Sequence, residues 1–258
     1  MTWKRVAVRT VSEVCAWKRG IFGPRLGFRI LLYHAVGSHL LHDTYGISIR
    51  SELFERHMAV LSRQGGISIV GLEDKPLSSA GLRVAITFDD GYQDNLKTAA
   101  PILLKYKIPF TVFATSSYIQ SGRAPYLNSD ELRELASLPG ASIGSHGATH
   151  IPLAECDDAT LWRELYDSRC YLEDVIKKPV QGIAYPHGSV SVRVMEAAQR
   201  AGYTLGGCSR FDINDVSRDP LLLYRSEIVA ADSERIFLQK LYGAWDWYRW
   251  RIRDLLVS

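Results

Sequence analysis

Short apolar segments alternate with helical stretches along most of the 258-residue chain. The apolar segments carry many β-branched and aromatic side chains and are typical of strands that are buried on both faces. Their alternation with helical stretches predicts a mostly parallel sheet, open or closed, with helices on the outside. We expect strands at Arg29–Tyr33, Ile67–Val70, Arg83–Phe88, Pro109–Ala114, Ala141–Gly144, Gly182–Tyr185, Tyr203–Gly206 and Tyr224–Val229, and helices at Glu52–Arg63, Gln93–Tyr106, Asp130–Ser137, Ala159–Ile176 and Ser191–Ala201.

Composition and length limit the class of protein. The chain is 47% hydrophobic and 23% charged, which excludes the composition of a disordered protein. One α/β barrel or two small domains could both bury a core at this length without disulfides. The four cysteines show no C-x-x-C spacing, so we expect isolated buried thiols rather than a zinc ribbon or a redox pair. No apolar stretch is typical of a signal peptide or a membrane span. We therefore expect neither feature, and we expect a cytoplasmic location.

Positive charge is concentrated at the two ends of the chain. The net charge of +3 is too small to indicate a nucleic-acid partner, and we expect none. Residues 1–25 carry +5 and residues 233–258 carry +2, which leaves −4 for the middle of the chain. Apolar side chains at helical spacing predict a helix over Arg235–Leu256, with Trp247 and Trp250 off the apolar stripe. Two interpretations stay open: a helix that packs on the barrel, or a peripheral membrane contact through its Trp and Arg side chains.

Polar side chains follow several expected strands, at the edge where parallel α/β sheets bind ligands. The segment T-F-D-D-G-Y at 87–92 places Asp89 and Asp90 directly after a strand. Adjacent carboxylates indicate a nearby cation or a hydrogen-bond network, unless they only form a turn. The segment S-H-G-A-T-H at 145–150 carries His146 and His150 four residues apart. Two imidazoles and one carboxylate form a common set of ligands for a divalent metal.

Two further clusters end strands, and each alone could be structural. The segment Y-P-H-G at 185–188 predicts a turn that can direct a backbone N–H or the His187 ring into a pocket, and His34 follows the first strand. Together the four clusters supply what metal-assisted hydrolysis of an amide or ester requires. Because these residues must converge on one pocket, we expect a single barrel domain at 29–232, between a basic segment at 1–28 and an amphipathic aromatic and basic helix at 233–258.

The segments T-F-D-D-G-Y, S-H-G-A-T-H and Y-P-H-G, in this order, resemble the motifs of the polysaccharide deacetylases, carbohydrate esterase family 4. The segment L-Y-H-A-V at 32–36 resembles the Tyr-His element of a circularly permuted branch, the poly-N-acetylglucosamine deacetylases. The resemblance implies a distorted (β/α) barrel and a metal-dependent hydrolase that removes acetyl groups from N-acetylated sugars. Its partner would be an N-acetylated glycan or a lipid-linked sugar. An O-acetyl esterase on a similar glycan and an inactive carbohydrate-binding homologue are the alternatives.

The resemblance also implies a metal site and a catalytic pair. Asp90, His146 and His150 would hold one divalent metal ion, for which we expect zinc, with Co²⁺, Ni²⁺ and Mn²⁺ as alternatives. Asp89 would be the general base. His34 would be the acid, because no Leu-His-Asp motif follows Tyr185, where many members of the family have one.

The third motif would supply the substrate groove. The resemblance implies that Tyr185, Pro186 and His187 line this groove, and that a backbone N–H near His187 stabilises the oxyanion. The family often has Tyr where this chain has His187, so either His34 or His187 could be the acid.

Overall fold

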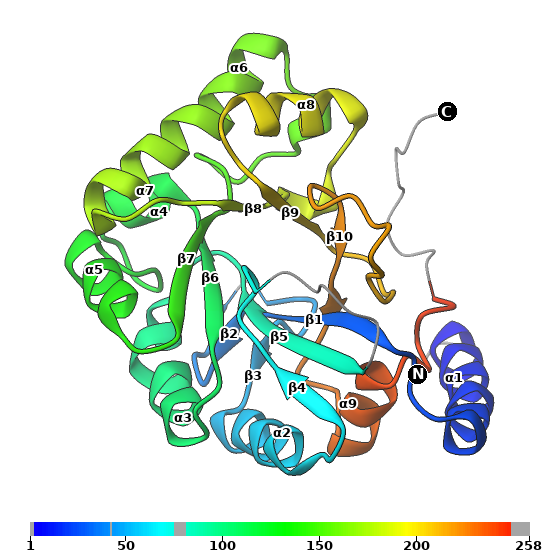
Figure 1. Cartoon of the computed structure of the whole chain (residues 1–258). Coiled ribbons are helices and arrows are strands. Elements are labelled where there is room, and N and C mark those ends of the chain that lie inside the picture. The colour runs from blue at the N-terminus through cyan, green and yellow to red at the C-terminus, as the bar shows by residue number, and fades with distance from the viewer. Residues whose placement is uncertain (1–2, 42, 75–80, 249–258) are drawn as a thin grey trace.

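A parallel sheet, nearly closed into a barrel, forms the centre of the protein, and helices surround it (Figure 1). The structure is a computed structural model that describes residues 3–41, 43–74 and 81–248. Over these residues the sheet has nine strands, in the order β10 (Leu223–Tyr224), β9 (Leu205–Cys208), β8 (Gly182–Ala184), β7 (Ala141–Ser145), β6 (Phe110–Ala114), β5 (Leu82–Phe88), β1 (Gly27–Tyr33) and β11 (Ser226–Glu227), with β4 (Ile67–Ile69) paired to β5. The short strands β2 (Ala35–Val36) and β3 (Ser48–Ile49) pair separately. The predicted single-domain α/β barrel is confirmed.

The two edges of the sheet meet at a single residue. Strands β10 and β11 occupy opposite edges, yet only Arg225 separates them along the chain. The prediction of one strand over Tyr224–Val229 is therefore wrong, because the chain passes from one edge of the sheet to the other within this segment. Arg225 is 1% exposed, so its guanidinium lies inside the protein at this seam.

The helices follow the predicted pattern, with additions. The helical stretches predicted at Gln93–Tyr106 and Ala159–Ile176 each contain a π-helical turn, η1 (Asn95–Ala99) and η3 (Arg163–Asp167). The sequence did not predict α1 or α4. The α-helices are α1 (Trp3–Phe22), α2 (Ser51–Arg63), α3 (Ala100–Lys105), α4 (Ser116–Ser121), α5 (Ser129–Ser137), α6 (Asp158–Trp162), α7 (Ser168–Ile176), α8 (Val192–Arg200) and α9 (Glu234–Leu241), and the 3₁₀ turns are η2 (Leu153–Glu155) and η4 (Pro186–Gly188).

The barrel is packed through aromatic side chains of neighbouring elements. Phe88 of β5 contacts Phe54 of α2 and Phe110 of β6 edge to face, with ring centroids 5.8 and 6.2 Å apart. Gly144 of β7 leaves room for the ring of Phe113, since a Cβ at Gly144 would lie only 2.3 Å from that ring. Close packing of this kind holds the strand ends, and the polar loops that follow them, in fixed positions.

The C-terminal helix is shorter than predicted. Helix α9 ends at Leu241, and the chain then forms turns up to Tyr248. Phe237 and Leu241 are fully buried, so the described part of this helix packs on the barrel, and Trp250 lies outside the described residues. Asp246 accepts two hydrogen bonds from the buried Arg29 of β1, at 2.8 and 2.9 Å. The apolar stripe predicted from the sequence thus serves packing as far as the structure describes it.

Within the described ranges, the helices are all too short or too polar to cross a membrane. Cys15, Cys156, Cys170 and Cys208 are free thiols, as predicted, but only Cys208 is buried, and Cys170 is exposed because it lies on the outer side of α7. The cytoplasmic location stays a prediction from the sequence.

Burial of a histidine in α2 predicts a pH-dependent stability. The ring of His57 stacks on Phe237 at a centroid distance of 4.4 Å, and burial lowers its pKa from 6.5 to about 4. The unfolded chain binds this proton below about pH 6.5, whereas the folded protein binds it only near pH 4. The free energy of unfolding should therefore fall by on the order of 2 kcal/mol between pH 7 and pH 5 because of this residue.

Urea denaturation across this pH range measures the effect. His57→Gln should flatten the curve relative to the unaltered protein, whereas His39→Gln, at an exposed position, should leave it unchanged. Equal pH dependence in the His57→Gln variant and the unaltered protein would show that the prediction is wrong.

Candidate active site

The adjacent carboxylates lie where β5 ends. Asp89 and Asp90 follow the last residue of this strand, and the backbone N–H of Asp89 donates to the carbonyl of Tyr33 at the end of β1. Asp90 has φ +73°, in the left-handed region that non-glycine residues rarely adopt, and Gly91 follows with φ +78°. This turn directs the two neighbouring carboxylates to different partners.

The two histidines of the second motif come from the loop after β7. His146 is buried, and its Nδ1 donates to the carbonyl of Ala184 at 2.8 Å, which directs Nε2 toward the pocket. His150 also has a positive φ, of 61°. The carboxylate of Glu164 holds the loop between them, since it accepts from the N–H groups of Ala148 and Thr149 at 2.8 and 3.0 Å.

Asp90, His146 and His150 form a candidate metal site. One possible ligand atom of each lies within 4.8 Å of the others. The Nε2 atoms of His146 and His150 are 3.4 and 3.2 Å from Oδ1 of Asp90, and ligands of a tetrahedral or octahedral divalent ion lie about 3–3.5 Å apart. Oδ1 of Asp90 is buried and, among the described residues, has no partner with hydrogen-bond geometry. The donor set and its spacing therefore fit a divalent cation.

Burial and the neighbouring charges set the protonation of these groups. Burial lowers the pKa of His146 to about 4, so its imidazole is neutral at neutral pH, the form that binds metal. Burial opposes ionisation of Asp90, but the neighbouring imidazoles of His150, His34 and His146 outweigh it and hold the Asp90 pKa well below its usual range. The pKa of His150 is raised, because its partner Asp90 outweighs the effect of burial.

Asp89 has a different partner, which the sequence analysis missed. Both of its oxygens accept hydrogen bonds from the guanidinium of Arg225, at 2.6 and 2.8 Å. Burial alone would raise the pKa of Asp89, but the charge of Arg225 outweighs it and lowers the pKa. The only sequence signal for Arg225 was a charged residue inside an apolar segment.

Asp89, the three residues of the candidate metal site and His34 line one pocket of about 460 Å³. His34 follows β1, which pairs with β5 in the register Tyr33 to Phe88, so His34 and Asp89 follow directly paired residues. Nδ1 of His34 is buried and has no hydrogen-bond partner among the described residues. Asp89 and Asp90, His146 and His150, and His34 therefore converge on one pocket, as predicted.

The third motif contributes less to this pocket than predicted. His187 lines it, with φ +57° and its ring 4.6 Å from that of His150. Tyr185 is fully buried and donates to the carbonyl of Leu221 at 2.7 Å, and Pro186 is also buried. Neither Tyr185 nor Pro186 lines this pocket: Tyr185 packs into the barrel, and Pro186 is buried next to Gly147.

Stacked tyrosines form part of the pocket lining and were also missed. The rings of Tyr118 and Tyr126 stack at a centroid distance of 4.1 Å, and Tyr126 also stacks on Tyr92 at 5.1 Å. Tyr118 comes from α4, Tyr126 from the following loop and Tyr92 from the first motif. No periodic pattern marks such residues, because each comes from a different segment.

Residues 79–206 match the family model described as Polysaccharide deacetylase. The parallel barrel carries the three sequence motifs at the ends of its strands, and residues 79–206 belong to the polysaccharide deacetylase family.

Curated relatives and a solved structure resemble the chain. It is 32% identical over 186 residues to the Bacillus subtilis protein named "Putative polysaccharide deacetylase YxkH", with 69% of this chain and 62% of the relative covered. It is 30% identical over 138 residues to a poly-beta-1,6-N-acetyl-D-glucosamine N-deacetylase of Staphylococcus aureus, with 48% of this chain and 46% of that relative covered. The alignments thus span less than two thirds of these relatives. The Streptococcus pyogenes deacetylase PplD, solved with acetate, has a TM-score of 0.74 at 25% identity and covers 84% of this chain and 99% of its own.

Loss of one histidine should abolish metal binding. His146→Ala removes a buried ligand atom, so we expect zinc affinity to fall by more than about 100-fold, beyond the loss typical of residues that only support a ligand. Isothermal titration calorimetry with the metal-free protein measures it. Asp89→Asn and the exposed control His39→Ala should bind zinc like the unaltered protein. Unchanged zinc affinity in His146→Ala would exclude this site.

Proposed function

We propose that the chain is a metal-dependent carbohydrate deacetylase that hydrolyses the N-acetyl groups of a poly- or oligosaccharide. One observation carries the proposal: the carboxylate of Asp89, outside the candidate triad, is buried in the same pocket with Oδ2 3.8 Å from Nε2 of His146. A second carboxylate so close to a metal triad is what a hydrolase needs for a general base. The name of the Staphylococcus aureus relative supports an N-acetylated sugar as substrate.

Asp90, His146 and His150 would hold one divalent ion, and zinc is the ion we propose. When bound, such an ion supplies a Lewis acid for the acetyl carbonyl and lowers the pKa of water. The protein's part is to hold three ligands on one side and to leave the pocket side accessible to substrate.

Asp89 takes the proton of the attacking water as its oxygen bonds to the acetyl carbon. The guanidinium of Arg225 occupies one site on each Asp89 oxygen, but a carboxylate has about four lone-pair sites, so acceptor capacity is left for the water. Arg225 also keeps Asp89 ionised, because its charge stabilises the carboxylate in a buried position. Two adjacent carboxylates thereby perform different tasks.

His34 donates a proton to the sugar nitrogen as the C–N bond breaks, and acetate and a free amine leave the pocket. An amide nitrogen is a poor leaving group unless it is protonated, so this step needs an acid on the pocket side of the substrate. His34 meets that need, because it lines the pocket beside Asp89.

The aromatic lining suits a sugar. Tyr118 and Tyr126 offer ring surface to the apolar C–H groups of a pyranose and hydroxyls to its polar groups, and Phe211 and Tyr45 add further aromatic surface. A pocket of about 460 Å³ falls in the range of small-molecule sites.

Acetate release from N-acetylated and O-acetylated oligosaccharides tests the reaction. The zinc-loaded protein should release acetate from N-acetylated oligosaccharides, and Asp89→Asn should lower kcat/KM by about 10²–10⁴-fold while zinc stays bound. Release from O-acetylated substrates alone would instead establish the esterase alternative. Carbohydrate binding without release from either would establish an inactive binding protein.

The role of His34 predicts a difference between amide and ester. An alkoxide leaves more easily than an amide anion, so His34→Gln should slow hydrolysis of an N-acetyl substrate by about 10²–10⁴-fold and affect an O-acetyl ester much less. His187→Gln provides the matched control at the other candidate histidine and should lack this selectivity. If His187→Gln shows the selectivity instead, His187 is the acid.

A further inference from the structure

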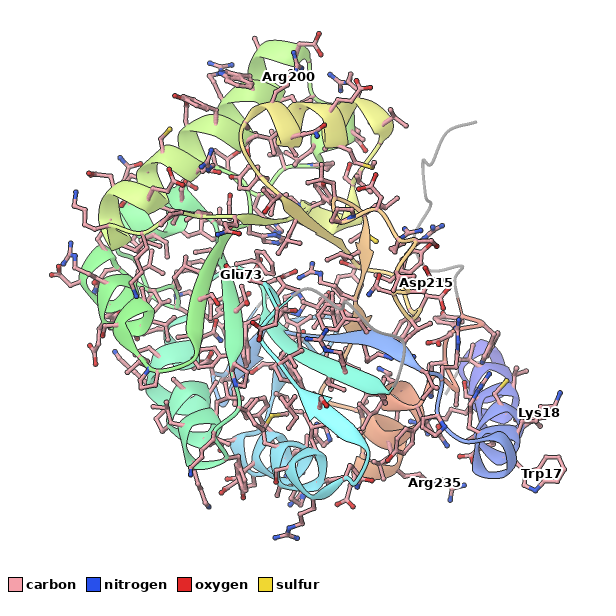
Figure 2. The ribbon with its side chains drawn as sticks, viewed as in Figure 1. Trp17, Lys18, Glu73, Arg200, Asp215 and Arg235 are labelled. Atoms are coloured by element: carbon pink, nitrogen blue, oxygen red, sulfur yellow. The ribbon has the colours of Figure 1, made fainter. Side chains whose placement is uncertain are left out.

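Helix α1 presents an apolar stripe to its surroundings. Trp17, Val14 and Val11 are 68%, 52% and 42% exposed, and their three-residue spacing places them on one side of the helix. Figure 2 shows Trp17 and the neighbouring Lys18 directed away from the barrel. Single exposed apolar side chains are ordinary, but adjacent ones on one helix face form a patch that suits an interaction surface.

The patch lies within a strongly basic helix. The sequence of α1 contains five basic residues and a single acidic one, Glu13. The carboxylate of Glu13 is paired with Arg235 at 2.5 Å, which neutralises it. Lys18 is exposed on the same side of the helix as the patch, whereas Arg9, also exposed, lies nearer to the side of Ser12. An apolar stripe with a Trp and surrounding cations has the composition of a helix that lies in the interface of an anionic membrane.

The opposite side of α1 is attached to the protein. Ser12 is fully buried and accepts a hydrogen bond from Nε1 of Trp247 at 3.2 Å. Arg25, just after the helix, forms ion pairs with Asp212 at 2.5 Å and Asp246 at 2.8 Å. The helix is therefore held with its apolar stripe outward.

Aromatic contacts connect this attachment to the pocket. The ring of Trp247 contacts Tyr248, and Tyr248 contacts Phe211, at centroid distances of 5.6 and 6.3 Å. Phe211 lines the pocket described above. Trp247, which contacts α1, is thus connected through Tyr248 to a residue that lines the pocket.

We propose that the outward face of α1 docks on the surface of an anionic lipid bilayer. Trp17 and Val14 would enter the interface, while Lys18 would contact lipid phosphates. A second copy of the chain is a poor occupant, because two such basic faces would repel each other. The membrane contact expected for the C-terminal segment stays a separate prediction; in its described part, Phe237 and Leu241 of α9 are buried in the barrel.

Co-sedimentation of the full chain with vesicles tests the proposal. Binding should be stronger to phosphatidylcholine vesicles that contain phosphatidylglycerol than to phosphatidylcholine alone, and should weaken with added salt. Lys18→Gln should lower the partition coefficient about fivefold, and Trp17→Ser on the order of tenfold. Circular dichroism and thermal unfolding confirm that each variant is folded.

Matched controls come from other exposed positions. Arg200→Gln, on α8 and far from α1 in Figure 2, and Val216→Ser, 71% exposed, should bind vesicles like the unaltered protein.

Equal binding by Trp17→Ser and the unaltered protein, or no preference for anionic vesicles, would overturn the proposal. A concentration-dependent dimer that Trp17→Ser abolishes, without vesicle binding, would also overturn it and assign the face to a second copy. Vesicle binding needs no acetyl chemistry, so its failure would leave the proposed deacetylase reaction unaffected.

Discussion

The guanidinium of Arg225 joins the seam of the barrel to the carboxylate of Asp89. Arg225 is the single residue between the two edge strands, and it is buried, as is its partner. Gly207 of β9 leaves space for it, since a Cβ there would lie 2.7 Å from Nε of Arg225. A buried charge without a partner costs about 3–5 kcal/mol, so neither residue of this pair can be lost cheaply. Closure of the sheet and ionisation of the proposed base thus depend on the same contact.

Backbone strain is concentrated at the pocket. Asp90, His150 and His187 all have positive φ, between 57° and 73°. Non-glycine residues persist in this region only where the surrounding structure holds them, and such residues cluster at functional sites. Here the surrounding structure is identifiable: the carboxylate of Glu164 holds the loop before His150, and paired strands hold the residues before Asp90. Of the five non-glycine residues with positive φ in the described part of the chain, these three line the pocket, and the other two, Lys107 and Lys177, follow helices α3 and α7.

Features that depend on neighbouring residues in the sequence could be predicted, whereas features that depend on contacts between distant residues could not. Strand β5 and the carboxylates after it could be predicted because a buried strand has a local composition and a turn has local signals. The same holds for β7 and its two histidines. The groove position of Tyr185 could not be predicted, because its side chain direction depends on packing against Leu221 across the sheet. The prediction of a longer C-terminal helix failed after Leu241 because the apolar spacing was followed past Gly243, which has φ +85° and ends the helix locally: the N–H groups of Gly243 and Ala244 donate to the carbonyls of Lys240 and Gln239.

The sequence by itself determined the barrel class, the family and the residues Asp89, Asp90, His146, His150 and His34, because strand patterns and motifs are written in neighbouring residues. Only the tertiary structure decided that Arg225 holds Asp89, that stacked tyrosines line the pocket and that Tyr185 does not. It also decided that α1, rather than α9, presents an apolar face outward. These features depend on contacts between residues far apart in the chain, and such contacts exist only once the strands have closed into a barrel.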